Sequence, residues 1–133
     1  MFLDSDQARR LLSRVDPARV HWGWPFGLRD TALLTLIASG LSAAEVFRLR
    51  AADITLDHGR LSVEIRRQGV PLSLVVPVEL RARLLAWLTA RRLWGTAEPV
   101  ITCPKGPLSL DGIYTLLRRY RRDLRRGRRP VKP

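Results

Sequence analysis

The spacing of apolar positions divides the chain into helical segments on either side of a short β region. An early helix is predicted to begin at Asp4, because Asp is a favourable N-cap residue and Gln7 can complement it three residues later. Asp16-Pro17 is expected to end this helix. Residues 28–39 are strongly apolar and contain no Gly or Pro, which predicts a buried helix with Gly40 just after its C-terminus.

A third helix is predicted from Ser42 to about Arg50, and its first turn contains a Ser-x-x-Glu pattern. In a capping box of this kind, the Ser42 hydroxyl accepts a hydrogen bond from the Glu45 amide. The Glu45 carboxylate in turn accepts one from the Ser42 amide. This local structural role is sufficient to account for Ser42.

The middle of the chain favours three short strands. The composition predicts extended backbone at residues 54–56, 60–67 and 72–76. Residues 60–67 also alternate between apolar and polar positions. The segments are separated by turns at 57–59 and 68–69, each of which contains a glycine. We therefore expect a three-stranded antiparallel meander.

Two further helices are predicted after the sheet. Residues 79–94 carry leucines at helical spacing and are followed by Gly95. The last helix is expected to begin after Ser109 and to end at Gly127. Its core face consists of apolar residues spaced three and four apart: Leu110, Ile113, Leu117, Tyr120 and Leu124. Its opposite face consists of arginines: Arg118, Arg119, Arg122, Arg125 and Arg126.

These elements predict an α+β fold that is mainly helical with a small three-stranded antiparallel sheet. At 133 residues and 46% hydrophobic composition, the chain is long enough for one folded domain, expected over residues 1–126 and followed by a basic tail at 127–133. No stretch approaches the ~20 apolar residues that a membrane-spanning helix needs. The charged first 15 residues lack the apolar centre of a signal peptide, so we expect a cytoplasmic protein without membrane contact.

The segment from His21 to Gly27 is predicted to be a loop because of its Gly and Pro content. It holds three aromatic side chains, Trp22, Trp24 and Phe26, which we expect to fold down onto the core. A base-stacking or cation–π role for Trp22 or Trp24 is the alternative, and we favour packing.

The single cysteine, Cys103, cannot form an internal disulfide and is interpreted as a small buried hydrophobic residue. It has no metal-binding companions, and a redox or nucleophilic role lacks support because the two histidines, His21 and His58, lie in predicted loops. We expect no metal site and no cofactor.

The charge of the chain is unevenly distributed. The net charge is +12, and residues 118–133 hold eight arginines and one lysine against one acid, Asp123. This segment therefore carries a net +8, which indicates a polyanion as partner. A membrane-surface helix is the alternative, and it is disfavoured because the segment contains no Trp or Phe.

The segment GLSAAEVFRLRAADITL, residues 40–56, resembles the first catalytic box of the tyrosine recombinases (phage-integrase family). In that family a Gly-Leu pair precedes an active-site arginine, and a Glu follows three residues later. Ser42 stands at the arginine position. Further segments resemble the family in the same order and extend the match over residues 4–126: DSDQARRLLSRVDP, LRDTALLTLIASGL, LVVPVELRARLLAWL and GPLSLDGIYTLLRRYRR. The resemblance implies the first half of a recombinase catalytic domain.

The resemblance also implies that the family's chemistry is lost. The family surrounds the scissile phosphate with two arginines, a lysine and one or two histidines while a tyrosine attacks, and losing one aligned donor costs about 10²–10³ in rate. Ser42 removes the first arginine, and no lysine occurs at residues 67–69, where the family has one. The His-x-x-Arg box and the nucleophilic tyrosine would lie beyond the last helix. Tyr114 and Tyr120 have no partners at motif spacing, so we expect no catalytic residues, unless the chain is one part of a split recombinase.

We therefore expect a non-catalytic DNA-binding protein derived from a tyrosine recombinase. It would bind duplex DNA mainly through backbone phosphates, which the forked guanidinium group suits. The alternative is a protein-interaction module that self-associates or docks on a full-length recombinase, because absent later helices would leave apolar surface uncovered. RNA is a third partner class. The candidate DNA-binding residues are Arg66, Arg67, Arg118, Arg119, Arg122, Arg125, Arg126, Arg128 and Arg129.

Overall fold

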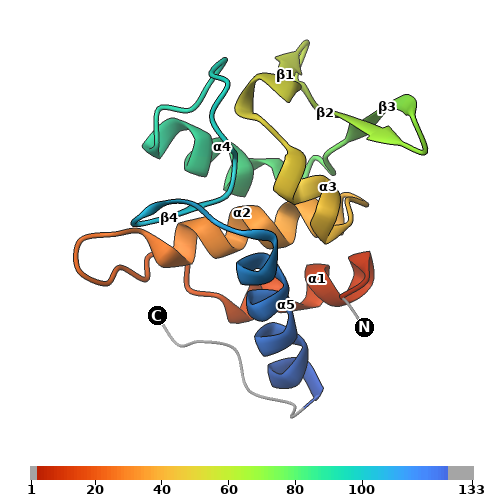
Figure 1. Cartoon of the computed structure of the whole chain (residues 1–133). Helices are drawn as coiled ribbons and strands as arrows, with labels where there is room; N and C mark the ends of the chain where they lie inside the picture. The colour runs from red at the N-terminus through yellow and green to blue at the C-terminus, as the bar shows by residue number, and fades with distance from the viewer. Residues whose placement is uncertain (1–2, 126–133) are drawn as a thin grey trace.

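Helix α2 (Phe26–Ala38) crosses the middle of the molecule, and the other helices pack around it (Figure 1). The structure is a computed structural model that describes residues 3–125. Nearly all of α2 is buried, as its breaker-free apolar sequence predicts. The remaining helices are α1 (Ser5–Leu11), η1 (Leu12–Arg14), α3 (Ala43–Arg48), η2 (Ala51–Asp53), α4 (Arg81–Ala90) and α5 (Leu110–Arg125).

The three predicted strands form an antiparallel meander in the order β1-β2-β3. Their bounds are β1 (Ile54–Asp57), β2 (Arg60–Arg67) and β3 (Val70–Val75). Val63 of β2 pairs with Ile54 on one side and with Leu74 on the other, which places these side chains on the face that turns toward the core. The β2–β3 turn has positive φ at Gln68 (54°) and Gly69 (77°), the conformation of a two-residue type I′ hairpin.

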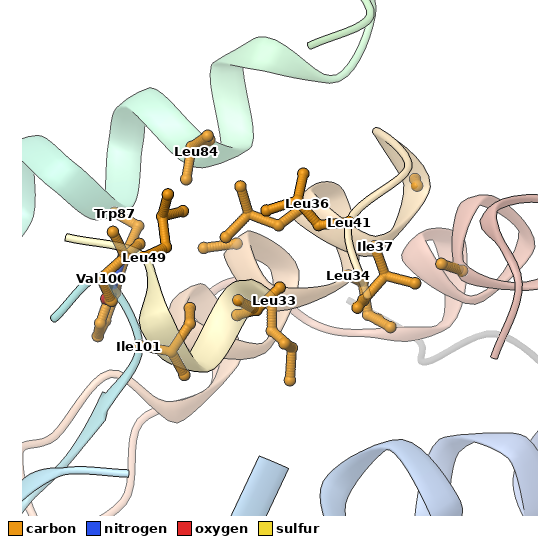
Figure 2. Close-up of a cluster of buried hydrophobic side chains, with 14 of the residues drawn as sticks. Leu33, Leu34, Leu36, Ile37, Leu41, Leu49, Leu84, Trp87, Val100 and Ile101 are labelled. Atoms are coloured by element: carbon orange, nitrogen blue, oxygen red, sulfur yellow. Dashed lines mark hydrogen bonds between the residues drawn. The ribbon is translucent and has the colours of Figure 1, made fainter. Parts of the chain in front are cut away.

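One hydrophobic core joins all the layers. Trp87 of α4 is fully buried, and its indole Nε1 donates a hydrogen bond of 2.7 Å to the carbonyl oxygen of Val100. This bond ties α4 to the segment that leads into α5. Figure 2 shows side chains of α2 meeting those of α4, of residues 100–101 and of the two leucines that flank α3: Leu33, Leu34, Leu36, Ile37, Leu41, Leu49, Leu84, Trp87, Val100 and Ile101.

Helix α4 is shorter than its predicted range of 79–94. A Schellman motif ends it early: the Leu93 amide donates to the carbonyl of Leu88 and the Arg92 amide to that of Thr89, with Arg92 at a φ of 53°. The sequence has Gly at position 95, and the chain leaves the helix before reaching it. The range was wrong because the left-handed residue here is an arginine.

Helix α3 also ends early, at Arg48 rather than near Arg50. The next residues pair with a distant segment: the Ala51 amide donates to the Glu98 carbonyl, and the Val100 amide donates to the Leu49 carbonyl. Leu49 and Arg50 have extended backbone where this pairing forms, so a long-range pairing ends the helix.

Two expectations about individual side chains were wrong. Cys103 is half-buried rather than buried, because it lies in a two-stranded hairpin of β4 (Thr102–Cys103) and β5 (Gly106–Pro107) at the surface. Trp22 is 93% exposed, because it occupies the tip of a turn that points away from the core. Packing is confirmed for Trp24, whose ring lies 5.8 Å from that of Trp87 in an edge-on arrangement.

The described part of the chain contains no helix that is long and apolar enough to cross a membrane. The predicted domain boundary, the end of the last helix at Gly127 and the arginines Arg126, Arg128 and Arg129 lie outside the described residues.

Candidate nucleic-acid interface

Helix α5 is strongly amphipathic. Ile113, Leu116 and Leu117 are buried against the core, and Tyr120 and Leu124 are half-buried further along the same side. The other side exposes four of the predicted DNA-binding residues: Arg118, Arg119, Arg122 and Arg125. The predicted division of this helix into an apolar and a basic face is therefore confirmed.

Four arginines of α5 also line a shallow hollow of about 350 Å³: Arg118, Arg121, Arg122 and Arg125. Arg121 was not among the predicted residues. It is half-buried and follows Leu117 by four positions, so its helical spacing suggests the edge of the core face. A side chain as long as arginine can leave that edge with its guanidinium group at the surface. We refer to Arg118, Arg119, Arg121, Arg122 and Arg125 as the α5 arginine surface.

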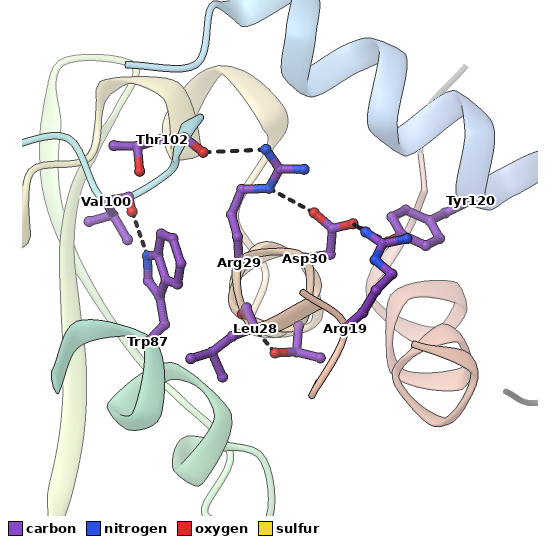
Figure 3. Close-up of polar contacts among 9 residues, drawn as sticks. Arg19, Leu28, Arg29, Asp30, Trp87, Val100, Thr102 and Tyr120 are labelled. Atoms are coloured by element: carbon purple, nitrogen blue, oxygen red, sulfur yellow. Dashed lines mark hydrogen bonds and ion pairs between the residues drawn. The ribbon is translucent and has the colours of Figure 1, made fainter. Parts of the chain in front are cut away.

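The α5 arginine surface is anchored to α2 through the buried carboxylate of Asp30. Asp30 is 1% exposed, and its Oδ1 accepts a hydrogen bond of 2.8 Å from Arg29 Nε. Its Oδ2 accepts one of 2.9 Å from Arg19 Nη2 and a second from the hydroxyl of Tyr120 (Figure 3). One carboxylate thus holds together the loop before α2, α2 itself and the C-terminal half of α5.

Tyr120 is therefore a structural residue. Burial raises the pKa of its phenol, and the negative charge of Asp30 and the hydrogen bond to it raise the pKa further. The hydroxyl donates a hydrogen bond to Asp30 and keeps its proton, so it is neither ionised nor directed at solvent. This environment opposes the formation of a phenolate nucleophile.

Arg29 is a buried cation whose guanidinium group is occupied by contacts with the surrounding side chains and backbone. Its side chain is 4% exposed, and its guanidinium carbon lies 5.4 Å from the ring centre of Trp24 and 5.2 Å from that of Phe26. Nη1 donates to the carbonyl oxygen of Thr102 at 3.3 Å. Arg29 therefore belongs to the core, with its charge balanced by Asp30.

Ser42 has the predicted structural role. Its hydroxyl accepts a hydrogen bond of 3.2 Å from the Glu45 amide, and its own amide donates to Glu45 Oε1 at 2.9 Å. The capping box of α3 is confirmed. An equivalent box at Asp4 and Gln7 begins α1.

Glu45 also binds Arg67 at the end of β2. The guanidinium group donates from Nε to Glu45 Oε2 at 3.0 Å and from Nη2 to Oε1 at 2.8 Å, a bidentate ion pair. Nη2 donates as well to the Gly40 carbonyl at 3.0 Å. The hydrogen bond from Arg67 is the main reason that the pKa of Glu45 lies below its ordinary value, and the pairing raises the pKa of Arg67.

Arg67 is thus an internally paired cation. The hollow beside it measures about 450 Å³, and acidic Asp4 and Glu45 line it together with Ser42 and Arg67. With two carboxylates to one guanidinium group, its lining does not favour an anion. The sequence indicated a cation near position 67, and it did not indicate that Glu45 pairs with it.

Arg66 lies beside Arg67 and is exposed. Its Nη1 donates to the Gly69 carbonyl at 2.8 Å, within the β2–β3 turn. Figure 1 places this turn and the C-terminal half of α5 at different ends of the molecule. The candidate arginines therefore occupy two separate surfaces. Among residues 3–125, no three His, Cys, Asp or Glu side chains come together as a metal site would require.

Comparisons with known proteins identify the fold. No family model and no curated protein matches the chain in sequence. Two solved structures match in three dimensions, each at 18% sequence identity. XerH site-specific recombinase bound to its difH substrate in a pre-cleavage complex gives a TM-score of 0.64, with 98% of this chain and 38% of that chain covered. XerA recombinase gives a TM-score of 0.61, with 100% and 46% covered.

The chain therefore has a tyrosine recombinase-like fold, as the sequence resemblance implied. It spans less than half of the length of either solved recombinase.

Proposed function

We propose that this chain is a DNA-binding module that uses a recombinase-like fold without cutting DNA. The observation that carries the proposal is the α5 arginine surface, a row of guanidinium groups on a helix whose other side is locked into the core. The fold adds support, because XerH, with the same fold, was solved with a DNA substrate.

The spacing of the arginines suits a phosphate backbone. Arg118, Arg122 and Arg125 follow one another at intervals of four and three, so they form one stripe about 10 Å long on the helix. Phosphates of one DNA strand follow at roughly 3.4 Å of rise, so such a stripe can face about three of them. Contacts of this type position a protein on DNA without reading its sequence.

Three side chains oppose cutting. Ser42 provides no cation where the family has an arginine, and Arg67 is already paired with Glu45. The phenol of Tyr120 donates to Asp30. Because each aligned donor contributes about 10²–10³ in rate, a site built from these residues would stabilise the transition state poorly. A suicide-substrate assay tests this directly, and a covalent protein–DNA adduct that depends on Tyr114 or Tyr120 would contradict the proposal.

The decisive experiment compares two double variants with equal loss of charge. We expect R118A/R122A to weaken duplex-DNA binding strongly and to reduce the log–log salt slope by about 1.8, that is, about 0.9 for each lost phosphate contact. R10A/R60A is the matched control, since Arg10 and Arg60 are exposed arginines on α1 and β2. An equal loss of affinity and slope in both variants would mean that bulk charge, and not the α5 arginine surface, binds DNA.

A protein-interaction module remains the second candidate, and the sheet supports it. Strands β1 and β3 are the edges of the sheet, with Leu56 50%, Val70 62% and Val75 51% exposed. Unpaired edge strands with apolar side chains favour pairing with another chain. Light scattering across a range of protein concentrations tests this function. Self-association through β3 would be excluded if the measured mass is that of a monomer at every concentration and is the same in a V70K/V75K variant.

A further inference from the structure

Trp22 occupies an unusual position for a large aromatic residue. Its side chain is 93% exposed, although a tryptophan normally buries roughly 150–250 Å² on folding. The neighbouring Trp24 follows that rule: its ring lies 4.6 Å from Phe26 and packs on Trp87. Trp22 therefore differs from its neighbour Trp24, and its side chain contributes little to the packing of the core.

The turn that carries Trp22 is well defined. His21 and Trp24 exchange two backbone hydrogen bonds, from the His21 amide to the Trp24 carbonyl at 3.1 Å and from the Trp24 amide to the His21 carbonyl at 3.0 Å. Between them, Trp22 and Gly23 have φ values of 53° and 73°, the conformation of a type I′ turn. A positive φ is uncommon for a bulky residue. The local structure thus holds an indole ring out in solvent at the tip of a two-residue turn.

The surroundings of the turn are cationic. Residues 17–25 contain no acidic residue. Arg19 is half exposed just before the turn, and the Arg91 guanidinium lies over the ring of Trp24, 5.4 Å from its centre. An exposed aromatic ring on a segment that carries arginine and no acid matches the chemistry of a nucleic acid, in which flat bases alternate with phosphates.

The turn shares an anchor with the α5 arginine surface. Arg19, three residues before Trp22, donates to the same Asp30 oxygen as Tyr120 of α5, and Figure 3 shows the two side chains meeting there. The base of the loop and the C-terminal half of α5 are therefore joined through one buried carboxylate. A strand bound on α5 would have to extend along the base of this loop to reach Trp22 at its tip.

We propose that Trp22 is a stacking contact for an unpaired base of DNA whose backbone lies on the α5 arginine surface. This inference rests on the proposed DNA-binding function. The base must be unpaired because both faces of a base in a duplex are covered by its neighbours. A ring on a tight turn can stack on a base in single-stranded DNA at little cost. The ligand class is thus DNA with single-stranded character.

The test compares single-stranded and duplex oligonucleotides of equal length at one salt concentration, with the full chain and its W22A, W22F and W94A variants. Trp94 is the control, because it is 37% exposed and lies after α4. We expect W22A to weaken single-strand binding at least about fivefold. Duplex affinity should change less than about twofold, and W22F should retain most of the binding. Photo-crosslinking of 5-bromodeoxyuridine should map to Trp22.

Three outcomes would overturn the inference. These are single-strand binding that W22A leaves unchanged, an equal weakening of both DNAs by W22A, and an effect of W22A no larger than that of W94A. If duplex binding is normal and W22A has no effect, the stacking contact fails and the proposed function stands. If neither DNA binds at any salt concentration, both fail. A loss of self-association in W22A without a loss of single-strand binding would assign Trp22 to a protein contact instead.

Discussion

Glu45 makes contacts in two directions. Within its helix it completes the capping box with Ser42, and across the structure it forms the bidentate pair with Arg67. The exposed fraction of the side chain is 9% for Glu45 and 46% for Arg67, so the carboxylate is held and the guanidinium group remains at the surface. Glu45 thus competes with any phosphate for Arg67.

Removing the charge of Glu45 should release Arg67 for DNA. In E45Q the amide oxygen can still accept from the Ser42 amide, since Gln serves in capping boxes, while the ion pair is lost. For a duplex long enough to reach both arginine surfaces, we expect tighter binding and a log–log salt slope that is steeper by about 0.9 for one added phosphate contact. The control is E79Q, which removes the same charge from the surface pair with Arg9. Equal gains in both variants would attribute the effect to net charge.

The same pair predicts a pH dependence of stability. The hydrogen bond from Arg67 holds the pKa of Glu45 below its ordinary value, so the ionised carboxylate favours the folded state. This contribution is complete above the unfolded-state pKa of about 4.3 and is lost as the pH falls through the lower folded-state pKa. Urea unfolding should therefore give a difference between the wild type and E45Q that is largest near neutral pH and shrinks below about pH 4. A difference that does not depend on pH would contradict this.

At the scale of elements, Asp30 determines how α5 sits on α2. Its carboxylate accepts from Arg29, Arg19 and Tyr120, so three elements depend on one buried charge. The three donors are unequal. Arg29 is buried with Asp30, whereas Arg19 is half exposed and can be hydrated instead.

The loss of unfolding free energy when each side chain is changed should reflect this difference in burial. D30N leaves the buried Arg29 cation without its counter-charge, so we expect a loss of about 3–5 kcal/mol. R19A removes a pair that is screened by solvent and should cost less than about 1 kcal/mol. Y120F should fall between them, at about 1–3 kcal/mol. Denaturant unfolding of the three variants measures this, and an R19A loss as large as that of D30N would disprove the order.

For the whole molecule, Trp87 joins the core to the segment that leads into α5. Its ring is fully buried, and it donates a hydrogen bond to the Val100 carbonyl. W87F would leave a void and an unsatisfied carbonyl, which should cost about 2–4 kcal/mol in unfolding free energy. W94F is the matched control and should cost less than about 1 kcal/mol, because Trp94 is partly exposed and its indole bonds to Thr89 at the surface. Comparable losses in thermal or chemical unfolding would contradict the role of Trp87 as a core residue.

Much of the fold could be predicted from sequence because its signals are local. A capping box joins residues three apart, a type I′ turn joins adjacent strands, and an amphipathic helix repeats every three or four residues. Ser42 with Glu45, the turn at Gln68-Gly69 and the two faces of α5 are all of this kind, and the structure has each of them. The tyrosine recombinase-like architecture followed from the order of these local elements.

Tertiary structure alone decided the contacts between residues that are distant in the chain. Arg67 meets Glu45 across 22 positions, and Tyr120 meets Asp30 across 90. Trp22 and Trp24 are two residues apart in the same aromatic loop, yet one is exposed and the other packs on Trp87. The physical reason is that local hydrogen bonding depends on neighbours along the chain. The partner of a charge and the burial of a ring depend on which distant surface the folded backbone brings to them.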